Sequence, residues 1–497
     1  MSSKARRRAC VVALAAVAAI FPSIAVSAQP STSPWHLDRI NQRALPLDDD
    51  TGRSVLTGAG VDVYVVDSGI RANHIEFGGR VVAGVDVPST TGSSEVTPPA
   101  SDCDGHGTHV AGLAAGATVG VAPGAKVFAV RVLDCNGDGE VDEVVEALKW
   151  VRAHHRGGRL AVVNMSLGVD LGDDGTAINS QVTAMIDEGM VVTVAAGNGD
   201  STGRGFDACR IAPGDVARAL TVGAVTAADV KATYSNFGSC VDLWAPGGDR
   251  VRPIESAWKD SADDYGFDIG TSMASPLVAG YAALLGEQQP GLCPDQLGRA
   301  IVERATTDAI TGLDSESPNR LLFLDTAPIP AEKPGRPSHV MVTADATSLV
   351  VSWDEPCDGG SPITGTTVSV LSKGKVVARA QASAGTNAVR VRGLRTGSRY
   401  QVVVKARNDI GDGIATKRLT TPALRSWRSG RTVSASSIGV TDGGLTLRWT
   451  ASSGTVRVCR VSQNPARVVF LRPGTCRVGL RTLAGQKAVV RNISVRP

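Results

Sequence analysis

Two hydrophobic patterns divide this chain of 497 residues. Between residues 48 and 323, short β-branched runs alternate with segments in which apolar residues recur every three or four positions. The runs at 127–133 and 190–194 predict strands that are buried on both faces, and residues 141–151 predict an amphipathic helix. This alternation predicts an α/β domain in which a doubly wound parallel sheet carries helices on both faces.

The second pattern begins beyond a proline-rich segment, residues 327–335, which predicts a semi-rigid linker. Apolar and polar residues then alternate along short runs separated by turn residues, which predicts all-β accessory domains. Trp353 ends one such run and Tyr400 precedes another. With these residues, the region 336–422 resembles a fibronectin type III sandwich, and the resemblance implies a core tryptophan and a corner tyrosine.

Residues 426–497 form a further β-rich segment. Two short runs around Cys459 and Cys476 predict a pair of strands. The segment resembles small immunoglobulin-like modules with one internal disulfide, which implies a bond between these two cysteines. Its arginines are interpreted as a solvated face, with contact to an anionic surface as the alternative.

The N-terminal residues 1–28 have the composition of a secretory signal peptide. Four basic residues precede an apolar run at 9–20, and Val26-Ser27-Ala28 offers small residues for cleavage. A membrane anchor is the alternative, but the run is too short to cross a bilayer, and no later segment is long and apolar enough. We therefore expect a secreted, extracellular protein without a membrane span.

Charge and cysteine content limit the classes of partner and the compartment in which the protein acts. The 51 basic and 48 acidic residues leave a net charge of only +3. Proteins that bind nucleic acid usually have a dense basic surface, and this charge balance does not require one, which argues against nucleic acid as a partner. Removal of residues 1–28 would leave eight of the nine cysteines, an even number that fits disulfides in an oxidising compartment. No CxxC or HExxH spacing occurs, so the sequence does not identify any metal ligands.

Three separate positions provide the groups of a nucleophilic mechanism. Asp67 ends an apolar run, and His106 lies between two glycines at the start of a small-residue helix. Ser272 follows Gly270 in the first turn of another predicted helix. A serine hydroxyl is a weak nucleophile, so it needs a neutral imidazole to take its proton and a carboxylate to orient that ring. A helix N-terminus beside the serine would stabilise an oxyanion.

These residues lie in the stretches VDSG at 66–69, HGTHVAG at 106–112 and GTSMASP at 270–276. Together the stretches resemble the subtilisin-like serine proteases, and in detail the proteinase K and aqualysin-like branch, over residues 34–326. The resemblance implies a serine endopeptidase that acts on protein or peptide substrates through an acyl-enzyme intermediate. It assigns orientation to Asp67, general base and acid catalysis to His106, and nucleophilic attack to Ser272.

The resemblance also assigns an oxyanion-hole role to Asn198, which stands in the stretch VAAGNG at 194–199. The alternative is an ordinary asparagine in a glycine-flanked turn. Because the other three residues accompany it, we favour the catalytic interpretation. Loss of such a donor typically costs about 3 to 4 kcal/mol of transition-state stabilisation.

The same resemblance implies a cleft in which the substrate lies as an added strand between two chain segments. The residues at its two edges are Gly137, Asp138 and Gly139 on one side and Ser166, Leu167 and Gly168 on the other. Segment 134–140 also matches half of an EF-hand calcium loop, but Val145 stands where a bidentate glutamate belongs, so an EF-hand is rejected. Asp138 and Glu140 favour basic side chains at outer subsites.

Two disulfides are implied by the resemblance, each worth about 3 kcal/mol. Their cysteines are Cys103 with Cys135 and Cys209 with Cys240. The pairing of Cys293 and Cys357 stays open. No cofactor is expected for the chemistry. A structural calcium ion remains an alternative, but the sequence identifies no ligands for it, because Thr226 stands where relatives carry a ligand aspartate. Relatives also carry a prodomain, for which residues 28–34 leave no room.

Two functions outside catalysis stay open at this stage. A binding protein could keep the fold without the activity, although four intact residues argue against a decayed site. An adhesion protein could use the accessory domains to bind a cell surface or an extracellular polymer. The side chain preferred at the scissile bond and the natural substrate do not follow from the sequence.

Overall fold

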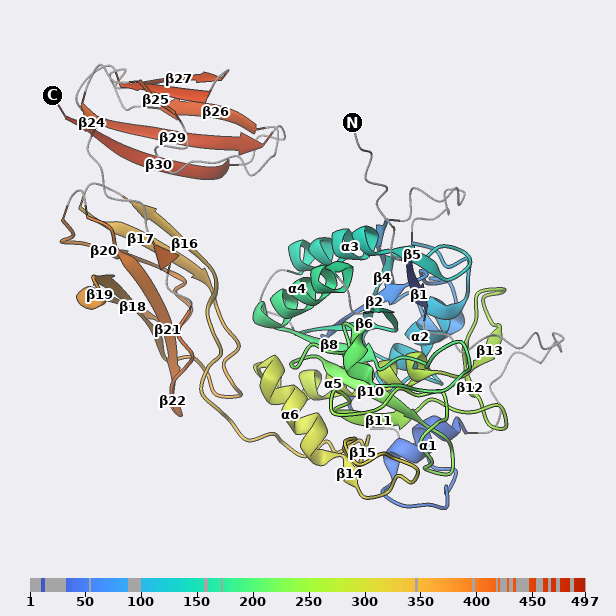
Figure 1. The fold of residues 1–497 in the computed structure, drawn as a ribbon. Helices are drawn as coiled ribbons and strands as arrows, with labels where there is room; N and C mark the ends of the chain where they lie inside the picture. Colours follow the sequence, from blue (N-terminus) through green and yellow to red (C-terminus); the bar gives the residue numbers. More distant parts are fainter. Residues whose placement is uncertain are drawn as a thin grey trace. The chain divides into compact units, whose positions relative to one another are not determined.

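The computed structural model describes residues 10–13, 33–52, 55–87, 100–155, 160–170, 173–344, 347–395 and 398–416, together with the backbone of strand segments between 419 and 496. The chain forms two compact units, Met1–Ala331 and Glu332–Pro497. Each unit is described by itself (Figure 1).

A nine-stranded sheet forms the centre of the first unit, and all its neighbouring strands are parallel except one short pair at an edge. In spatial order the strands are β14 (Thr306–Thr307), β15 (Arg320–Leu321), β11 (Leu243–Pro246), β10 (Leu220–Val225), β8 (Met190–Ala195), β6 (Ala161–Met165), β2 (Asp62–Asp67), β4 (Lys126–Arg131) and β3 (Val81–Asp86). Strand β2 lies where the chain order reverses, with β4 on one side and β6 on the other. Open α/β sheets form a crevice at the carboxyl ends of such strands.

Helices cover both faces of this sheet, which confirms the predicted α/β architecture (Figure 1). The helices are α1 (Trp35–Asn41), η1 (Ile75–Phe77), α2 (His106–Ala115), α3 (Val141–His154), α4 (Asp173–Asp187), η2 (Ala208–Arg210), α5 (Thr271–Gln288) and α6 (Pro294–Arg304). Side chains alternate along β2, so Val63 and Val65 pack with α2 and α5, whereas Tyr64 and Val66 pack with α3 and α4. Helix α5 is apolar around most of its circumference because it is buried inside the unit.

Two smaller sheets complete the first unit. One contains β5 (Asp138–Glu140), β1 (Cys10–Ala13), β7 (Leu167–Asp170) and β9 (Ile211–Ala212), in that spatial order. The other is an antiparallel ribbon of β12 (Ile254–Ala257) and β13 (Tyr265–Asp268). Both contribute to the site described below.

The second unit begins with two antiparallel sheets. They contain β16 (Ser338–Ala344), β17 (Leu349–Asp354) and β20 (Ala388–Val391) in one, and β19 (Lys375–Ser383), β18 (Gly365–Ser372), β21 (Gln401–Asn408), β22 (Gly411–Asp412) and β23 (Leu419–Thr420) in the other. Trp353 is buried in their common core, and the buried Tyr400 accepts a hydrogen bond on its hydroxyl from the N–H of Arg395 at 2.8 Å. The predicted core tryptophan and corner tyrosine are therefore confirmed.

The final strands again form two sheets. They contain β24 (Trp427–Arg428), β30 (Lys487–Arg496), β29 (Gly474–Thr482) and β26 (Leu447–Ser452) in one, and β25 (Thr432–Ser434), β28 (Ala466–Phe470) and β27 (Cys459–Gln463) in the other. The predicted strands exist, but their predicted pairing is wrong. Cys459 lies on β27, which pairs with β28, whereas Cys476 lies on β29, which pairs with β26 and β30. These two side chains lie outside the described residues, so their disulfide stays a prediction.

Candidate active site

Asp67 is the last residue of β2 and is completely buried. Its Oδ1 accepts hydrogen bonds from the backbone N–H of Ser68 and from Nδ1 of His106, both at 2.8 Å. The strand before it is apolar because helices cover both faces of the sheet. A buried carboxylate needs hydrogen-bond donors, and these become available where the strand ends and two loops approach.

A second buried carboxylate, which the sequence analysis missed, holds the loop that leads to His106. Asp102 accepts five hydrogen bonds of 2.6–3.0 Å. The donors are the hydroxyl of Ser68, the N–H groups of Asp104 and Gly105, and both the N–H and the hydroxyl of Thr108. Asp102 therefore fixes the segment that carries His106 against the segment that carries Asp67.

His106 begins helix α2 and is almost completely buried. Burial opposes its protonation, but the charge and the hydrogen bond of Asp67 outweigh burial and raise the pKa of His106 to about 9. The charges of Asp268 and Asp104 act in the same direction. Its Nε2 is buried and has no hydrogen-bond partner among the described residues. The ring is therefore held at one nitrogen and able to accept a proton at the other once it is neutral.

Ser272 is the second residue of α5 and is buried. Its hydroxyl donates to the carbonyl oxygen of Ser166 at 3.3 Å, and its own carbonyl oxygen accepts from the Ser166 hydroxyl at 2.9 Å. The first N–H groups of a helix lack intrahelical acceptors, and the helix dipole is positive there. A negative oxygen that forms beside Ser272 would be stabilised by both effects.

Asn198 lies against the same helix start. Its Oδ1 accepts from the N–H of Thr271 at 2.9 Å and from the Thr271 hydroxyl at 2.8 Å. These contacts fix the orientation of the amide, so that Nδ2 is the buried end without a hydrogen-bond partner among the described residues. A buried, unsatisfied donor next to Ser272 has the chemistry required to bind an oxyanion.

Two glycines allow the loops around Asp67 and His106 to approach each other. A Cβ on Gly107 would lie 2.2 Å from the carbonyl oxygen of Gly69. A Cβ on Gly69, whose φ is +108°, would lie 2.7 Å from the carbonyl oxygen of Ser101. Both positions require glycine because a side chain would meet rigid backbone rather than a movable side chain.

The two predicted substrate edges lie on strands of one small sheet. Residues 138–140 form β5, and residues 167–170 form β7. Strand β1 lies between them and is antiparallel to both, with Val12 opposite Asp138 on one side and opposite Gly168 on the other (Figure 1). The space between the edges therefore accepts an extended chain that satisfies the backbone hydrogen bonds of both.

Two disulfides lie in the first unit, between Cys103 and Cys135 and between Cys209 and Cys240. Cys103 precedes His106 by three residues, and Cys135 precedes β5 by three residues. The first bridge therefore connects the His106 loop to one edge of the β5–β7 space. Cys293 and Cys357 are each disulfide-bonded as well.

The described residues contain no group of three or more His, Cys, Asp or Glu side chains arranged to hold a metal ion. Asp229, which follows Thr226 in the segment considered for calcium, uses both carboxylate oxygens on Arg39, at 2.6 Å and 2.9 Å. The charge of this carboxylate is thus neutralised by a buried guanidinium. The residues near Thr226 do not fit a calcium site.

His109, one turn after His106, is buried, and burial lowers its pKa to about 3, so it is a neutral structural histidine whose Nε2 bonds to the carbonyl oxygen of Ile254 at 3.1 Å. Across the residues that the structure describes, no helix has the length and apolar character needed to traverse a bilayer.

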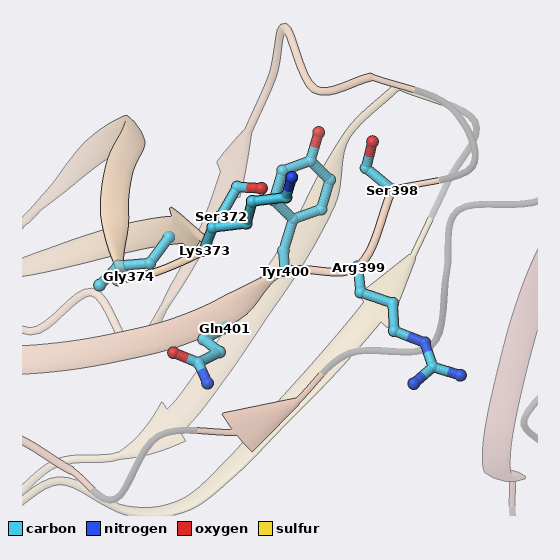
Figure 2. Close-up of a pocket in the computed structure, with 8 residues that line it drawn as sticks. Ser372, Lys373, Gly374, Ser398, Arg399, Tyr400 and Gln401 are labelled. Carbon is cyan, nitrogen blue, oxygen red and sulfur yellow. The ribbon is translucent and has the colours of Figure 1, made fainter.

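The second unit contains a hollow of about 370 Å³ between the β18–β19 turn and the start of β21 (Figure 2). Its lining residues are Leu371, Ser372, Lys373, Gly374, Ser398, Arg399, Tyr400 and Gln401. Lys373 and Arg399 give it positive charge, whereas the Tyr400 hydroxyl is already bonded to backbone. The hollow therefore offers positive charge for an anionic ligand.

Comparison with protein families gives two matches along the chain. A model described as "Subtilase family" matches residues 58–320, and one described as "Fibronectin type III domain" matches residues 335–422. The first match contains Asp67, His106, Asn198 and Ser272.

Individual proteins resemble the first unit. An extracellular serine proteinase from Thermus sp. (strain Rt41A) is 45% identical over 295 residues, which cover 59% of this chain and 66% of that protein. Alkaline serine exoprotease A from Vibrio alginolyticus is 41% identical over 302 residues, covering 61% and 52%. The chain thus spans less than two thirds of the length of either relative. A solved cold adapted subtilisin-like serine proteinase is 40% identical, with a TM-score of 0.54 over 60% of this chain and 100% of that chain.

Proposed function

Because the chain belongs to the Subtilase family, we propose that it is a secreted serine endopeptidase that uses Asp67, His106 and Ser272 to hydrolyse peptide bonds. The observation that carries this proposal is the 2.8 Å contact between Asp67 and Nδ1 of His106, while Nε2 has no hydrogen-bond partner among the described residues. The start of α5 provides both a serine hydroxyl and donors for an oxyanion.

The proposed reaction proceeds in two halves. Ser272 Oγ attacks the carbonyl carbon of the substrate while its proton passes to Nε2 of neutral His106, and Asp67 stabilises the resulting imidazolium. Asn198 Nδ2 and the Ser272 N–H hold the oxyanion of the tetrahedral intermediate. The C–N bond then breaks as His106 gives its proton to the leaving amine. Water, activated by His106, hydrolyses the acyl-enzyme and restores Ser272.

We propose that the substrate backbone lies between β5 and β7. The edge residues would be Gly137, Asp138, Gly139, Ser166, Leu167 and Gly168. Support comes from β1, whose residues pair with both edges in antiparallel register. Main-chain pairing of this kind holds peptides of many sequences, so it suits an enzyme that acts on unfolded protein.

Hydrolysis of unfolded casein tests the function. The protein and its Ser272→Ala variant are compared, each with and without a serine-directed fluorophosphonate. We expect cleavage only by the untreated protein, and labelling of that protein at Ser272 alone. Ser180→Ala is the matched control, because Ser180 is exposed and its hydroxyl donates only to the Thr176 carbonyl oxygen of its own helix. A well-folded protein that neither labels nor cleaves would contradict the proposal.

The proposed chemistry needs no cofactor, since the side chains supply nucleophile, base and oxyanion donors. A structural calcium ion is a separate question. If the protein holds one, EDTA should lower the melting temperature at unchanged initial rate. An equal melting temperature with EDTA and with added calcium would exclude it.

We propose the following domain organisation: a signal peptide at 1–28, the protease domain at 34–326, a linker at 327–335, the fibronectin type III domain at 336–422 and an immunoglobulin-like module at 426–497. The extracellular relative and the two disulfides of the first unit support export. N-terminal sequencing of the exported protein tests the cleavage site after Ala28.

For the accessory domains, we propose binding to an anionic cell surface or extracellular polymer. Lys373 and Arg399 at the hollow in Figure 2 favour this role. Co-sedimentation of the Ser272→Ala protein with insoluble cell wall should weaken in Lys373→Glu/Arg399→Glu and with added salt. Lys375→Glu, at an exposed position outside the hollow, is the control. Equal sedimentation of all three proteins would contradict the proposal.

A further inference from the structure

The β12–β13 ribbon connects the helix that begins with His106 to the helix that carries Ser272. Ser256 on β12 donates from its hydroxyl to the carbonyl oxygen of His109 at 2.8 Å, and His109 Nε2 bonds to the carbonyl oxygen of Ile254 at 3.1 Å. Ile254 lies directly opposite Asp268 in the ribbon. The end of β13 is therefore held beside α2.

Asp268 stands at this end, four residues before Ser272. Its Oδ1 accepts from the N–H of Ile269 at 2.7 Å, which fixes the orientation of the carboxylate. Among the described residues no lysine or arginine forms an ion pair with Asp268. A constrained carboxylate without a cationic partner stabilises a positive charge that forms on a neighbouring group.

On α2, His109 stays neutral because burial lowers its pKa to about 3, so His106 is the group that can become positive. Asp268 interacts electrostatically with His106, with Asp104 and with Asp67. Burial is the main cause that raises the pKa of Asp268 to about 6, so Asp268 is ionised at neutral and alkaline pH. Tyr234 also faces Asp268, but burial raises its pKa well above its ordinary value and its hydroxyl donates to the carbonyl oxygens of Gly247 and Gly248, so it carries no charge.

We propose that Asp268 is a positioning residue for His106: its carboxylate stabilises the imidazolium that forms during catalysis and raises the lower pH limit of activity. The inference rests on the proposed function, in which His106 is the general base. Asp67 holds the ring at Nδ1, while Asp268 acts through space from the chain segment that leads into Ser272. The carboxylate does not contact the reacting atoms in this role.

The sign of the expected change follows from charge. Asp268→Asn removes a negative charge that favours the imidazolium, so the pKa of His106 should fall, by roughly half a unit to one unit. Neutral His106 then becomes available at lower pH, and the acidic limb of kcat/KM should shift to lower pH by the same amount. At the plateau, kcat should fall several-fold because the imidazolium is less stable.

Two measurements test this in the full chain. NMR titration of the His106 ring in the inactive Ser272→Ala variant measures the pKa of His106 independently of catalysis. The pH profile of kcat/KM shows how that pKa affects the active enzyme. Asp268→Glu, which keeps the charge, should restore both values. Asp242→Asn is the matched control, since burial also raises the pKa of Asp242 to about 6 and its carboxylate accepts from the N–H of Thr221 at 2.8 Å, but His106 does not contribute to its titration.

The outcomes are distinct. A shift in Asp268→Asn that is absent in Asp242→Asn and reversed in Asp268→Glu supports the role. An unchanged His106 titration in folded Asp268→Asn overturns it, even if activity falls. If no variant or native protein cleaves casein, the proposed function fails, while the NMR titration still decides whether Asp268 acts on His106. If Asp268→Asn does not fold, the His106 titration in Asp268→Ala decides, because alanine also removes the carboxylate charge.

Discussion

Strands β8 and β18 show how differently the two units use a sheet. Every residue of β8 is buried, whereas buried and half-buried residues alternate along the first six residues of β18. Helices cover both faces of the first sheet, but the second packs only one face on its core. Side chains inside the strands of the first sheet are therefore mostly apolar, and polar exceptions such as Asn164 and Thr193 are hydrogen-bonded to each other, whereas polar side chains occur along the whole length of the second sheet.

This difference decides where function can be recognised. In the first unit, Asp67 at the end of β2 and Ser272 at the start of α5 interrupt otherwise apolar surroundings. In the second unit, Lys373 and Arg399 are two polar residues among many exposed ones. Four substitutions test the contrast, beginning with the largest effect.

Asp67→Asn and Asp62→Asn each remove a carboxylate from one end of β2 and so compare the two ends of this strand. In Asp67→Asn we expect kcat to fall about 10⁴-fold, because an amide no longer holds the required tautomer of His106 or stabilises its charge. Asp62→Asn at the opposite end of β2 should leave kcat/KM within about twofold. Steady-state kinetics on one peptide substrate measures both. Equal losses in the two variants would contradict a site confined to the carboxyl end.

Trp353→Ala tests whether the second unit matters only for its own folding. Loss of this buried side chain should destabilise the fibronectin type III domain by about 3–5 kcal/mol. Denaturant unfolding in the Ser272→Ala background measures the loss without self-digestion. The same substitution in active enzyme should leave kcat on a short peptide unchanged, since every proposed catalytic residue lies in the first unit. A parallel loss of kcat would show that the units are coupled.

Asn198→Ala removes the proposed oxyanion donor and leaves the proposed general base, His106, unchanged. We expect kcat to fall about 10²–10³-fold, or about 3–4 kcal/mol, with little change in KM. Asn179→Ala is a control because its amide bonds only to Asp215, outside the site. A rise in KM at constant kcat would instead indicate that Asn198 binds the ground state.

Tyr400→Phe is the smallest change. It removes the hydroxyl that accepts from the Arg395 N–H, which should cost about 1 kcal/mol and lower the melting temperature of the domain by about 5 °C. Polymer binding should persist, because the charges at the hollow are unchanged. Loss of binding at unchanged stability would make Tyr400 a ligand contact rather than a corner tyrosine.

The sequence predicts the features that depend on local patterns. Continuous apolar runs indicate the buried parallel strands. His106, between two glycines, and Ser272, two residues after Gly270, indicate helix starts. Alternation in the second unit predicts strands, but a period of two does not determine which strands pair. For this reason the pairing predicted around Cys459 and Cys476 is wrong, although both residues lie on strands.

Asp102 and Asp268 illustrate what the sequence does not reveal. Asp102 receives a hydrogen bond from Ser68, 34 residues earlier, and Asp268 approaches α2 only because β12 packs on that helix. Single acidic residues in loops and short strands are common, so no sequence pattern distinguishes Asp102 and Asp268 from the others. Their roles depend on tertiary contacts between segments that are distant in the chain.

The contact between Gly69 and Gly107 restricts how the enzyme can be re-engineered. A side chain at either position would collide with backbone atoms of another segment. A second substitution at the other glycine could not relieve that collision. A library of variants should therefore keep both glycines constant and diversify the strands β5 and β7, whose edge groups are satisfied by main-chain pairing. Few sequences are compatible with the backbone around His106, whereas many are compatible with β5 and β7.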